Sequence, residues 1–240
     1  IQTIAISNNI SHDVINPSHE ISNMNPIEKY QDKILTAFIE SVIKTHEIST
    51  QLIAHKKFQN NYHEVDIESK NLLRFTYKNF GLFIWKSDQF FLSFKCGAIG
   101  LYSRGGHDHN DQLSYELYFN NPIVTDPGTG VYTSIPKIRN YYRSITAHSS
   151  PQILNHKRQI IEPGDLNQGM FSLNSKQQSE LIYYSEKLII GFNEKISTIR
   201  ILLLNDNSIQ IFDLLLNDEM NFTQSKPIPF SKGYGFFKTS

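Results

Sequence analysis

The stretch KLIIGFNEKISTIRILLLNDNSIQIFDLL, residues 187–215, decides the fold because it holds three apolar runs in quick succession. Lys187–Phe192, Thr198–Leu204 and Ile209–Leu215 are each rich in Ile, Leu or Phe, and only short polar segments separate them. Runs of this length, bounded by turn-forming residues, are typical of β-strands. The stretch therefore predicts antiparallel strands joined by tight turns.

Similar runs occur through most of the chain and extend this prediction. Two pairs of them flank the turn signals Ser87-Asp88 and Asn120-Asn121-Pro122, so each pair is predicted to form a hairpin. The further strand-like runs are Phe80–Trp85, Gln89–Cys96, Ser114–Phe119, Ile123–Thr125, Met170–Leu173 and Leu181–Tyr184. We therefore expect a mainly β fold over residues 75–240, an antiparallel β-sandwich or stacked β-sheets.

Residues 1–74 are predicted to be an N-terminal connecting and helical segment. Residues 1–24 are polar and lack periodicity, whereas Asn25, Pro26 and Glu28 form a helix-start signal. Apolar residues then recur at helical spacing, namely Ile34, Leu35, Phe38, Ile39, Val42 and Ile43. We expect the helical part to end near Phe58–Asn61. Its apolar stripe needs a partner, either the following sheet or a larger helical domain.

The bulk composition excludes several classes of protein. Lysine plus arginine and aspartate plus glutamate both number 23, so no global field would attract nucleic acid, and no nucleic-acid recognition motif is present. No apolar run has the length of a membrane span. The single cysteine, Cys96, lies in an apolar run and is expected to be a buried core residue without a disulfide partner.

The main candidates for functional side chains lie in GGHDHNDQ, residues 105–112, where one residue separates His107 from His109. In extended backbone the period of two sends both imidazoles to the same side. Imidazole is the commonest metal ligand, and a carboxylate would complete an open three-ligand site. Asp126, at the Asp-Pro-Gly turn, is the obvious carboxylate, and His148 is a second distant candidate.

The alternative for any of these residues is a structural role. An isolated histidine is more often structural than a ligand, and we interpret five histidines without matching spacing in that way: His12, His19, His46, His55 and His63. An Asp-Pro-Gly sequence is more often a simple turn. Spacing alone leaves both interpretations of His107 and His109 open.

A resemblance favours the functional interpretation. GGHDHNDQLSYELYFNNPIVTDPGTGVYT (residues 105–133), followed by RNYYRSITAHSS (residues 139–150), resembles the heparinase II/III-like region of polysaccharide lyases, and the similarity runs from about Phe80 to Leu154. In that family a helical toroid precedes a β-sandwich region that carries the His-x-His. The resemblance implies that the short helical segment here is a remnant of such a toroid.

The resemblance also implies roles for individual residues. His109, Asp126 and His148 would bind a divalent metal, most often zinc, and His107 would face the cleft and act in catalysis. Enzymes of this family cleave anionic polysaccharides that contain uronic acid, of the heparan sulfate or alginate kind, by β-elimination. Their Tyr and His acid/base residues come from the toroid, and residues 1–70 contain no segment that matches these. Family membership would place the protein in the periplasm or outside the cell.

The segment between Asp126 and His148 suggests how an anionic partner is bound. No acidic residue occurs from Pro127 through Ile161, whereas Lys137, Arg139, Arg143, Lys157 and Arg158 all lie there. Arginine suits carboxylate or sulfate recognition and tyrosine can stack on sugar faces. We therefore assign Arg139, Tyr142 and Arg143 to substrate binding, with a solvated basic loop as the alternative.

Two other functions are compatible with these residues. A non-catalytic carbohydrate-binding or metal-stabilised structural module would keep the metal ligands without an upstream catalytic domain. Metal-dependent hydrolysis would require a carboxylate base near His109, and alternation in the strand around Tyr115 puts Glu116 on the wrong face for that role. A polysaccharide lyase remains the function that we expect.

Overall fold

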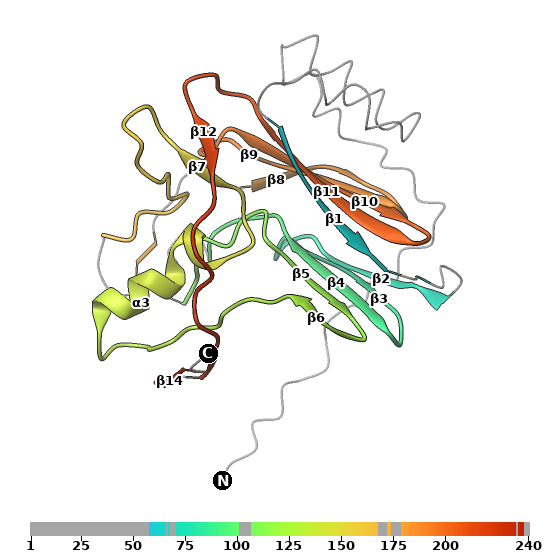
Figure 1. Cartoon of the computed structure of the whole chain (residues 1–240), viewed down its shortest axis with the longest axis horizontal. Coiled ribbons are helices and arrows are strands. Elements are labelled where there is room, and N and C mark those ends of the chain that lie inside the picture. Colours follow the sequence, from blue (N-terminus) through green and yellow to red (C-terminus); the bar gives the residue numbers. More distant parts are fainter. Residues whose placement is uncertain are drawn as a thin grey trace.

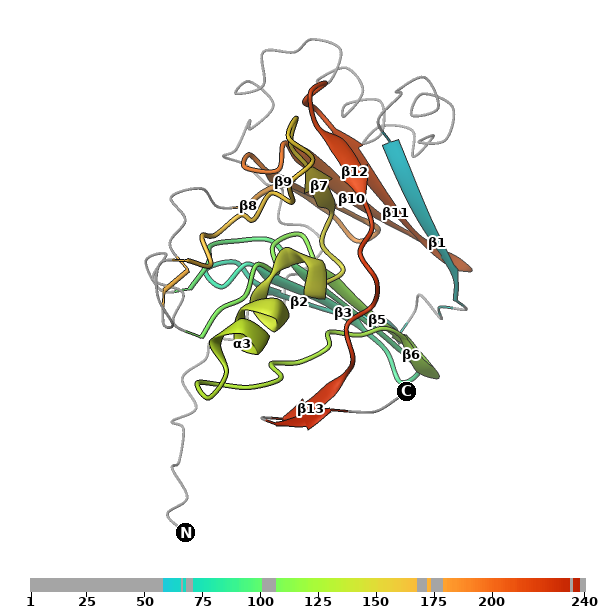
Figure 2. The same ribbon diagram turned by 60° about the vertical axis from the view of Figure 1, so that its left-hand side comes forward.

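Two five-stranded antiparallel sheets, stacked face to face, make up most of the described fold (Figures 1 and 2). The computed structural model describes residues 58–65, 67, 71–100, 107–167, 172–173, 179–233 and 235–237. The mainly β fold and the sandwich architecture predicted from the sequence are therefore confirmed.

The first sheet has the strand order β2-β3-β4-β5-β6. Its strands are β2 (Leu73–Tyr77), β3 (Leu82–Lys86), β4 (Phe90–Lys95), β5 (Tyr115–Phe119) and β6 (Asn121–Val124). Both hairpins predicted in this region are present, because β3 pairs with β4 and β5 pairs with β6. The sheet is a simple meander in which each strand pairs with the next along the chain.

The second sheet has the order β1-β11-β10-β9-β8. Its strands are β1 (Phe58–Glu64), β8 (Ser179–Tyr184), β9 (Leu188–Asn193), β10 (Thr198–Asn205) and β11 (Ser208–Leu215). The three runs between residues 187 and 215 thus form consecutive antiparallel strands, as predicted. The run at Leu181–Tyr184 is also a strand, whereas residues 172–173 of the run at Met170–Leu173 lie outside any strand.

The prediction that the helical segment extends to Phe58–Asn61 is wrong, because these residues begin strand β1. Strand β1 pairs with β11 at the edge of the second sheet, so the sandwich takes in residues before position 75. The expected helix start at residues 25–28 and the stripe from Ile34 to Ile43 lie outside the described residues.

A short helix, α3 (Pro136–Arg143), and a 3-10 turn, η4 (Ile145–Ala147), occupy part of the basic segment, for which a solvated loop was the alternative interpretation. Figures 1 and 2 show α3 beside one end of the sandwich. Two small pairs of strands complete the described fold, β7 (Gln152–Leu154) with β12 (Asn221–Thr223) and β13 (Ser231–Gly233) with β14 (Phe236–Phe237). In the described ranges no helix has the length and apolar character needed to cross a membrane.

The main core lies between the two sheets. Strand alternation sends Phe83, Trp85 and Phe94 inward from the first sheet to meet Leu202 and Ile211 of the second. Cys96 is buried in this cluster and is free of disulfide bonding, as expected. A second apolar cluster, which includes Ile190, Ile201 and Phe212, occupies the opposite face of the second sheet. Strand β10 is therefore buried on both faces, which explains its continuous apolar sequence.

Candidate active site

A polar pocket of about 360 Å³ lies at one end of the first sheet. The residues that line it come from strands β3, β4 and β5 and from the loops before β5 and after β6, and they include Leu82, Ser93, Lys95, His107, Asp108, His109, Asp111, Glu116, Asp126, Thr129 and His148. His107, His109, Asp126 and His148, which the sequence analysis singled out, are all among them. The fold therefore brings the four candidates together from three separate segments.

The Asp-Pro-Gly turn aims Asp126 at His148. Gly128 has a φ of +84°, a left-handed conformation that favours glycine, and its N–H donates to Asp126 Oδ1 at 2.8 Å. The other carboxylate oxygen, Oδ2, lies 2.5 Å from His148 Nδ1. The turn thus leaves one oxygen of Asp126 for the backbone and directs the other into the pocket.

His148 follows the 3-10 turn η4 and is almost fully buried, with 5% of its surface exposed. Burial disfavours the charged imidazole, but the hydrogen bond and the negative charge of Asp126 outweigh that effect and raise the pKa of His148. The same hydrogen bond and charge lower the pKa of Asp126 against the opposite effect of its own burial. The second ring nitrogen, His148 Nε2, is buried and has no hydrogen-bond partner among the residues that the structure describes.

His109 lies beside this pair, with its ring centroid 5.2 Å from that of His148. The pKa of His109 is lowered to about 3. Burial is the largest cause, and the positive charges of His148 and the nearby arginines add to it. The imidazole is therefore neutral at physiological pH, which is the form that binds metal ions.

These donors fit a divalent cation, although they do not form a ready-made cluster. Among the residues that the structure describes, no three His, Cys, Asp or Glu side chains are arranged to hold a metal ion. Asp126 and His148 instead bond to each other. A neutral imidazole, an ionised carboxylate and an orphaned buried ring nitrogen are nevertheless the donor set of an open zinc-type site. The metal site stays a prediction.

His107 is exposed and is paired with Tyr132, a residue that the sequence analysis did not select. The two rings are stacked, with centroids 5.3 Å apart and an angle of 10° between their planes. The Tyr132 hydroxyl lies 3.2 Å from His107 Nε2, within hydrogen-bonding distance. Tyr132 is part of the motif that carries the family resemblance, so its place there was the available signal.

Helix α3 packs against the His-x-His loop, and its buried side chains support that loop and do not face a ligand. Its positions 139, 142 and 143 share one helical face, and all three side chains are buried. Arg143 donates through Nε to the Asp108 carbonyl at 3.0 Å and through Nη2 to Ser172 at 3.1 Å, while the Tyr142 hydroxyl donates to the Pro229 carbonyl.

None of Arg139, Tyr142 and Arg143 lines the pocket. The guanidinium carbon of Arg139 lies 5.9 Å from the ring centroid of Tyr132, which stacks on His107. Substrate binding by these three residues stays a prediction that the geometry of the pocket does not support.

Asn110 and Glu162 fix the other side of the loop, and sequence reasoning missed both. Asn110 is fully buried; its backbone N–H donates to the Arg143 carbonyl and its side chain bonds to both backbone groups of Gly164. Its Nδ2 also donates to Glu162, which accepts from Ser144 Oγ and from the backbone N–H of Ile145. Burial raises the pKa of Glu162. The network ties the His109 loop to the turn that carries His148.

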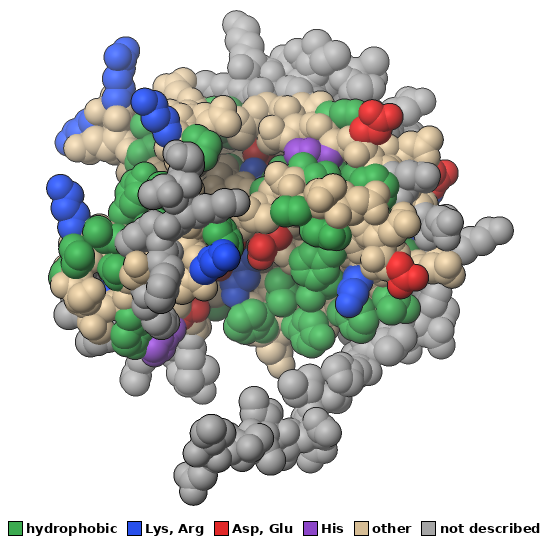
Figure 3. Space-filling view, turned by 60° about the horizontal axis from the view of Figure 1, so that its bottom comes forward, with side chains coloured by type: hydrophobic (Ala, Val, Ile, Leu, Met, Phe, Trp, Pro, Cys, Tyr) green, Lys and Arg blue, Asp and Glu red, His purple; other side chains and the backbone are tan. Residues whose placement is uncertain are grey.

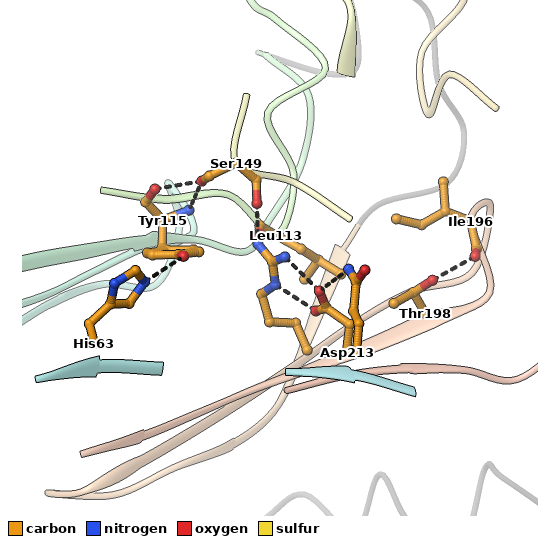
Figure 4. A network of polar contacts seen from close by, with 9 residues as sticks. His63, Leu113, Tyr115, Ser149, Ile196, Thr198 and Asp213 are labelled. Atoms are coloured by element: carbon orange, nitrogen blue, oxygen red, sulfur yellow. Dashed lines mark hydrogen bonds and ion pairs between the residues drawn. The ribbon is translucent and has the colours of Figure 1, made fainter. Parts of the chain in front are cut away.

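A second buried network ties the pocket to the second sheet (Figure 4). Arg200 on β10 forms two bonds to Asp213 on β11, of 2.7 and 2.8 Å. Its Nη1 donates to the carbonyls of Leu113 and Ser149, each at 2.5 Å. These carbonyls follow the His-x-His loop and His148 respectively, so the inner face of the second sheet positions both halves of the site. The serine also bonds to the backbone of Tyr115 through its hydroxyl.

The pocket is acidic, contrary to the basic surface expected from the segment after Asp126. Among the described residues, the carboxyl groups of Asp108, Asp111, Glu116 and Asp126 line it, together with the ammonium of Lys95 and the imidazole of His148, whose pKa is raised. The basic residues of the 127–161 segment are absent from the lining. The prediction that Glu116 faces away from His109 is also wrong, because both line the pocket and Glu116 Oε2 lies 3.5 Å from the Asp126 backbone nitrogen.

Comparison with known protein families gives one match. The model of the heparinase II/III-like C-terminal family matches residues 70–214, more than half of the chain. No curated protein and no solved structure matches the chain significantly. The matched range contains the His-x-His loop, the Asp-Pro-Gly turn and His148, and it covers both sheets from β2 to most of β11.

Proposed function

The chain belongs to the heparinase II/III-like C-terminal family, and on this premise we propose that it forms the metal-bearing part of a polysaccharide lyase. The substrate would be a uronic-acid-containing polysaccharide, of the heparan sulfate or alginate kind. The observation that carries the proposal is the convergence of His107, His109, Asp126 and His148 on one pocket. This cluster is unlike a structural polar cluster, because the buried Nε2 of His148 has no partner in the described part of the chain.

The proposed reaction is β-elimination next to the uronate carboxylate. A base takes the C5 proton, the electron pair forms the C4–C5 double bond, the C4–O bond breaks, and the departing oxygen gains a proton. We assign His107 to proton transfer because its ring is exposed at the pocket while Tyr132 stacks on it and fixes its plane.

His109, Asp126 and His148 would hold a divalent cation, which we propose is zinc. When bound, the cation would supply positive charge to the pocket and fix the loop that presents His107. The charges of the pocket support this proposal, because among the described residues four carboxyl groups outnumber the cations of Lys95 and His148, an excess that disfavours a bound uronate. An anionic sugar therefore needs a cation, or protonated carboxyl groups, in order to enter. Burial does raise the pKa values of Asp111 and Glu116.

Metal content tests the metal part of the proposal. We expect about one zinc per chain by elemental analysis of the wild type. The zinc should be lost in His109→Ala, Asp126→Ala and His148→Ala and retained in the matched control His107→Ala. Equal zinc in all five proteins, or none in the wild type, would refute the metal site.

Activity tests the catalytic part. The wild type is incubated with heparan sulfate or alginate, and with a neutral polysaccharide as control. The unsaturated products absorb in the ultraviolet, so the rise in absorbance measures product formation. Product formation on a uronate polymer that falls by at least about 10²-fold in His107→Ala is the expected result. Tight binding of the polymer without any product would instead favour the non-catalytic binding module.

A further inference from the structure

The outer face of the first sheet continues from the pocket as an open surface. Strand register places Lys86, Phe91 and Tyr118 side by side on β3, β4 and β5. Strand alternation puts them on the same face as Leu82, Lys95 and Glu116, which line the pocket. The row of Lys86, Phe91 and Tyr118, together with Phe80 and Lys95, which also line the pocket and connect it to that row, is called the outer strip below.

The outer strip is rich in uncovered apolar surface. Phe80 is 60% exposed and Tyr118 is 41% exposed, and neighbouring Leu73 on β2, which pairs with Lys86, is 58% exposed. Figure 3 looks at the molecule from this side and shows hydrophobic side chains gathered around a hollow, with acidic and basic side chains beside it. Large exposed apolar side chains next to a polar pocket are typical of a ligand-binding surface.

Cations are interleaved with these rings. The Lys95 ammonium lies 3.9 Å from the centroid of the Phe80 ring and donates to the Phe80 carbonyl at 3.2 Å. Lys86 is exposed beside Phe91. The acidic member of this face, Glu116, lies at the pocket end. Flat apolar rings suit the faces of sugar rings, and adjacent ammonium groups suit their carboxylates or sulfates.

We infer that the outer strip binds further sugar residues of an anionic oligosaccharide whose reacting uronate occupies the pocket. This inference rests on the proposed function and adds a subsite to it. Phe91 and Tyr118 would stack on sugar rings, while Lys86 and Lys95 would pair with the acidic groups of the same chain. The number of sugars bound then exceeds what the pocket alone accommodates.

The size of the strip favours a carbohydrate chain over a protein partner. Along β4 the distance from Lys95 to Phe91 is about 13 Å, and across three strands the strip measures roughly 10 Å. That area is far below the ~800 Å² per partner of a stable protein interface. A narrow polymer that also fills the adjoining pocket needs no larger surface.

Calorimetric titration of the full chain with alginate and heparan sulfate di-, tetra- and hexasaccharides tests the inference. We expect the wild type to bind hexasaccharides more tightly than disaccharides. Tyr118→Ala and Phe91→Ala should each lose roughly tenfold in hexasaccharide affinity, the effect of one stacked ring, with disaccharide affinity unchanged. Tyr118→Phe retains the ring and should bind like the wild type. Tyr62→Ala removes a 58% exposed tyrosine from β1 of the other sheet and is the matched surface control.

The outcomes separate this inference from the proposed function. Disaccharide binding without any gain in affinity for longer chains would overturn the outer strip and leave the proposed function intact. Failure of every uronate oligosaccharide to bind would refute both. A dimer in sedimentation velocity that Tyr118→Ala abolishes would show that a second copy covers the strip, and that result would also overturn the inference.

Discussion

At the scale of single residues, the Asp-Pro-Gly turn has no room for a side chain at its glycine. Gly128 adopts a left-handed φ of +84°, and a Cβ atom added there would lie 2.5 Å from the Ser231 carbonyl oxygen. Its N–H also holds Asp126 Oδ1. Gly128 orients the Asp126 carboxylate and is thus as important to the pocket as the carboxylate itself.

We predict that Gly128→Ala destabilises the protein by at least about 1–2 kcal/mol, the cost of a left-handed conformation for a residue with a Cβ. The clash with Ser231 adds to that cost and should turn Asp126 away from His148, so zinc affinity should fall as well. Urea unfolding and zinc titration measure the two effects. Gly233→Ala is the control, because no heavy atom lies within 4 Å of its Cβ position. Equal behaviour of the two variants would contradict the role of the turn.

At the scale of elements, alternation and turn chemistry made the strands of both sheets predictable. The runs from β8 to β11 and the two hairpins of the first sheet follow from local pattern alone. Helix α3 did not, because Ile135 at its start makes no side-chain capping bond and no acidic residue lies in its first turn. Strand β1 was predicted as the end of a helix, because its sequence FQNNYHE has few apolar residues and its pairing with β11 is a long-range contact.

The Arg200–Asp213 pair joins β10 and β11 to the loops of the pocket, and both side chains are almost fully buried. We predict that Arg200→Met costs about 3–5 kcal/mol, because it leaves the Asp213 carboxylate buried without its partner. The double variant Arg200→Met with Asp213→Leu should lose much less than the sum of the single variants. A double-mutant cycle by urea unfolding measures this coupling, and strictly additive losses would contradict it.

At the scale of the whole molecule, the residues of the site were predictable from the sequence, whereas the charge of the pocket depended on which side chains the fold buries. His107, His109, Asp126 and His148 were predictable because a recognisable motif carries them, and their convergence follows from the order of the loops. The charge of the pocket was not predictable. The acid-free segment suggested a positive cleft, but α3 turns Arg139 and Arg143 into the interior, where Arg143 bonds to the backbone of the His-x-His loop. Only tertiary packing decides whether a charged side chain faces a ligand or the core.

One contact between the two sheets should make the stability of the protein depend on pH. His63 on β1 places Nε2 at 3.1 Å from the hydroxyl of Tyr115 on β5, so one imidazole links the edge strand of the second sheet to an inner strand of the first. Burial lowers the pKa of His63 below its ordinary value of 6.5. The folded protein therefore favours the neutral ring. The stability that this provides is complete above the ordinary pKa and is lost as the pH falls through it towards the lowered value.

We therefore predict that the wild type loses more thermal stability than His63→Asn when the pH falls from about 7.5 to about 5.5, the range in which histidine titrates. The difference should be small, because the ring is only partly buried. Asparagine does not titrate, so the variant retains a polar partner for Tyr115 without the proton linkage. Differential scanning calorimetry at each pH measures the effect, with the exposed His156→Asn as the control. Parallel losses in the wild type and His63→Asn would show that the bridge between the sheets does not respond to protons.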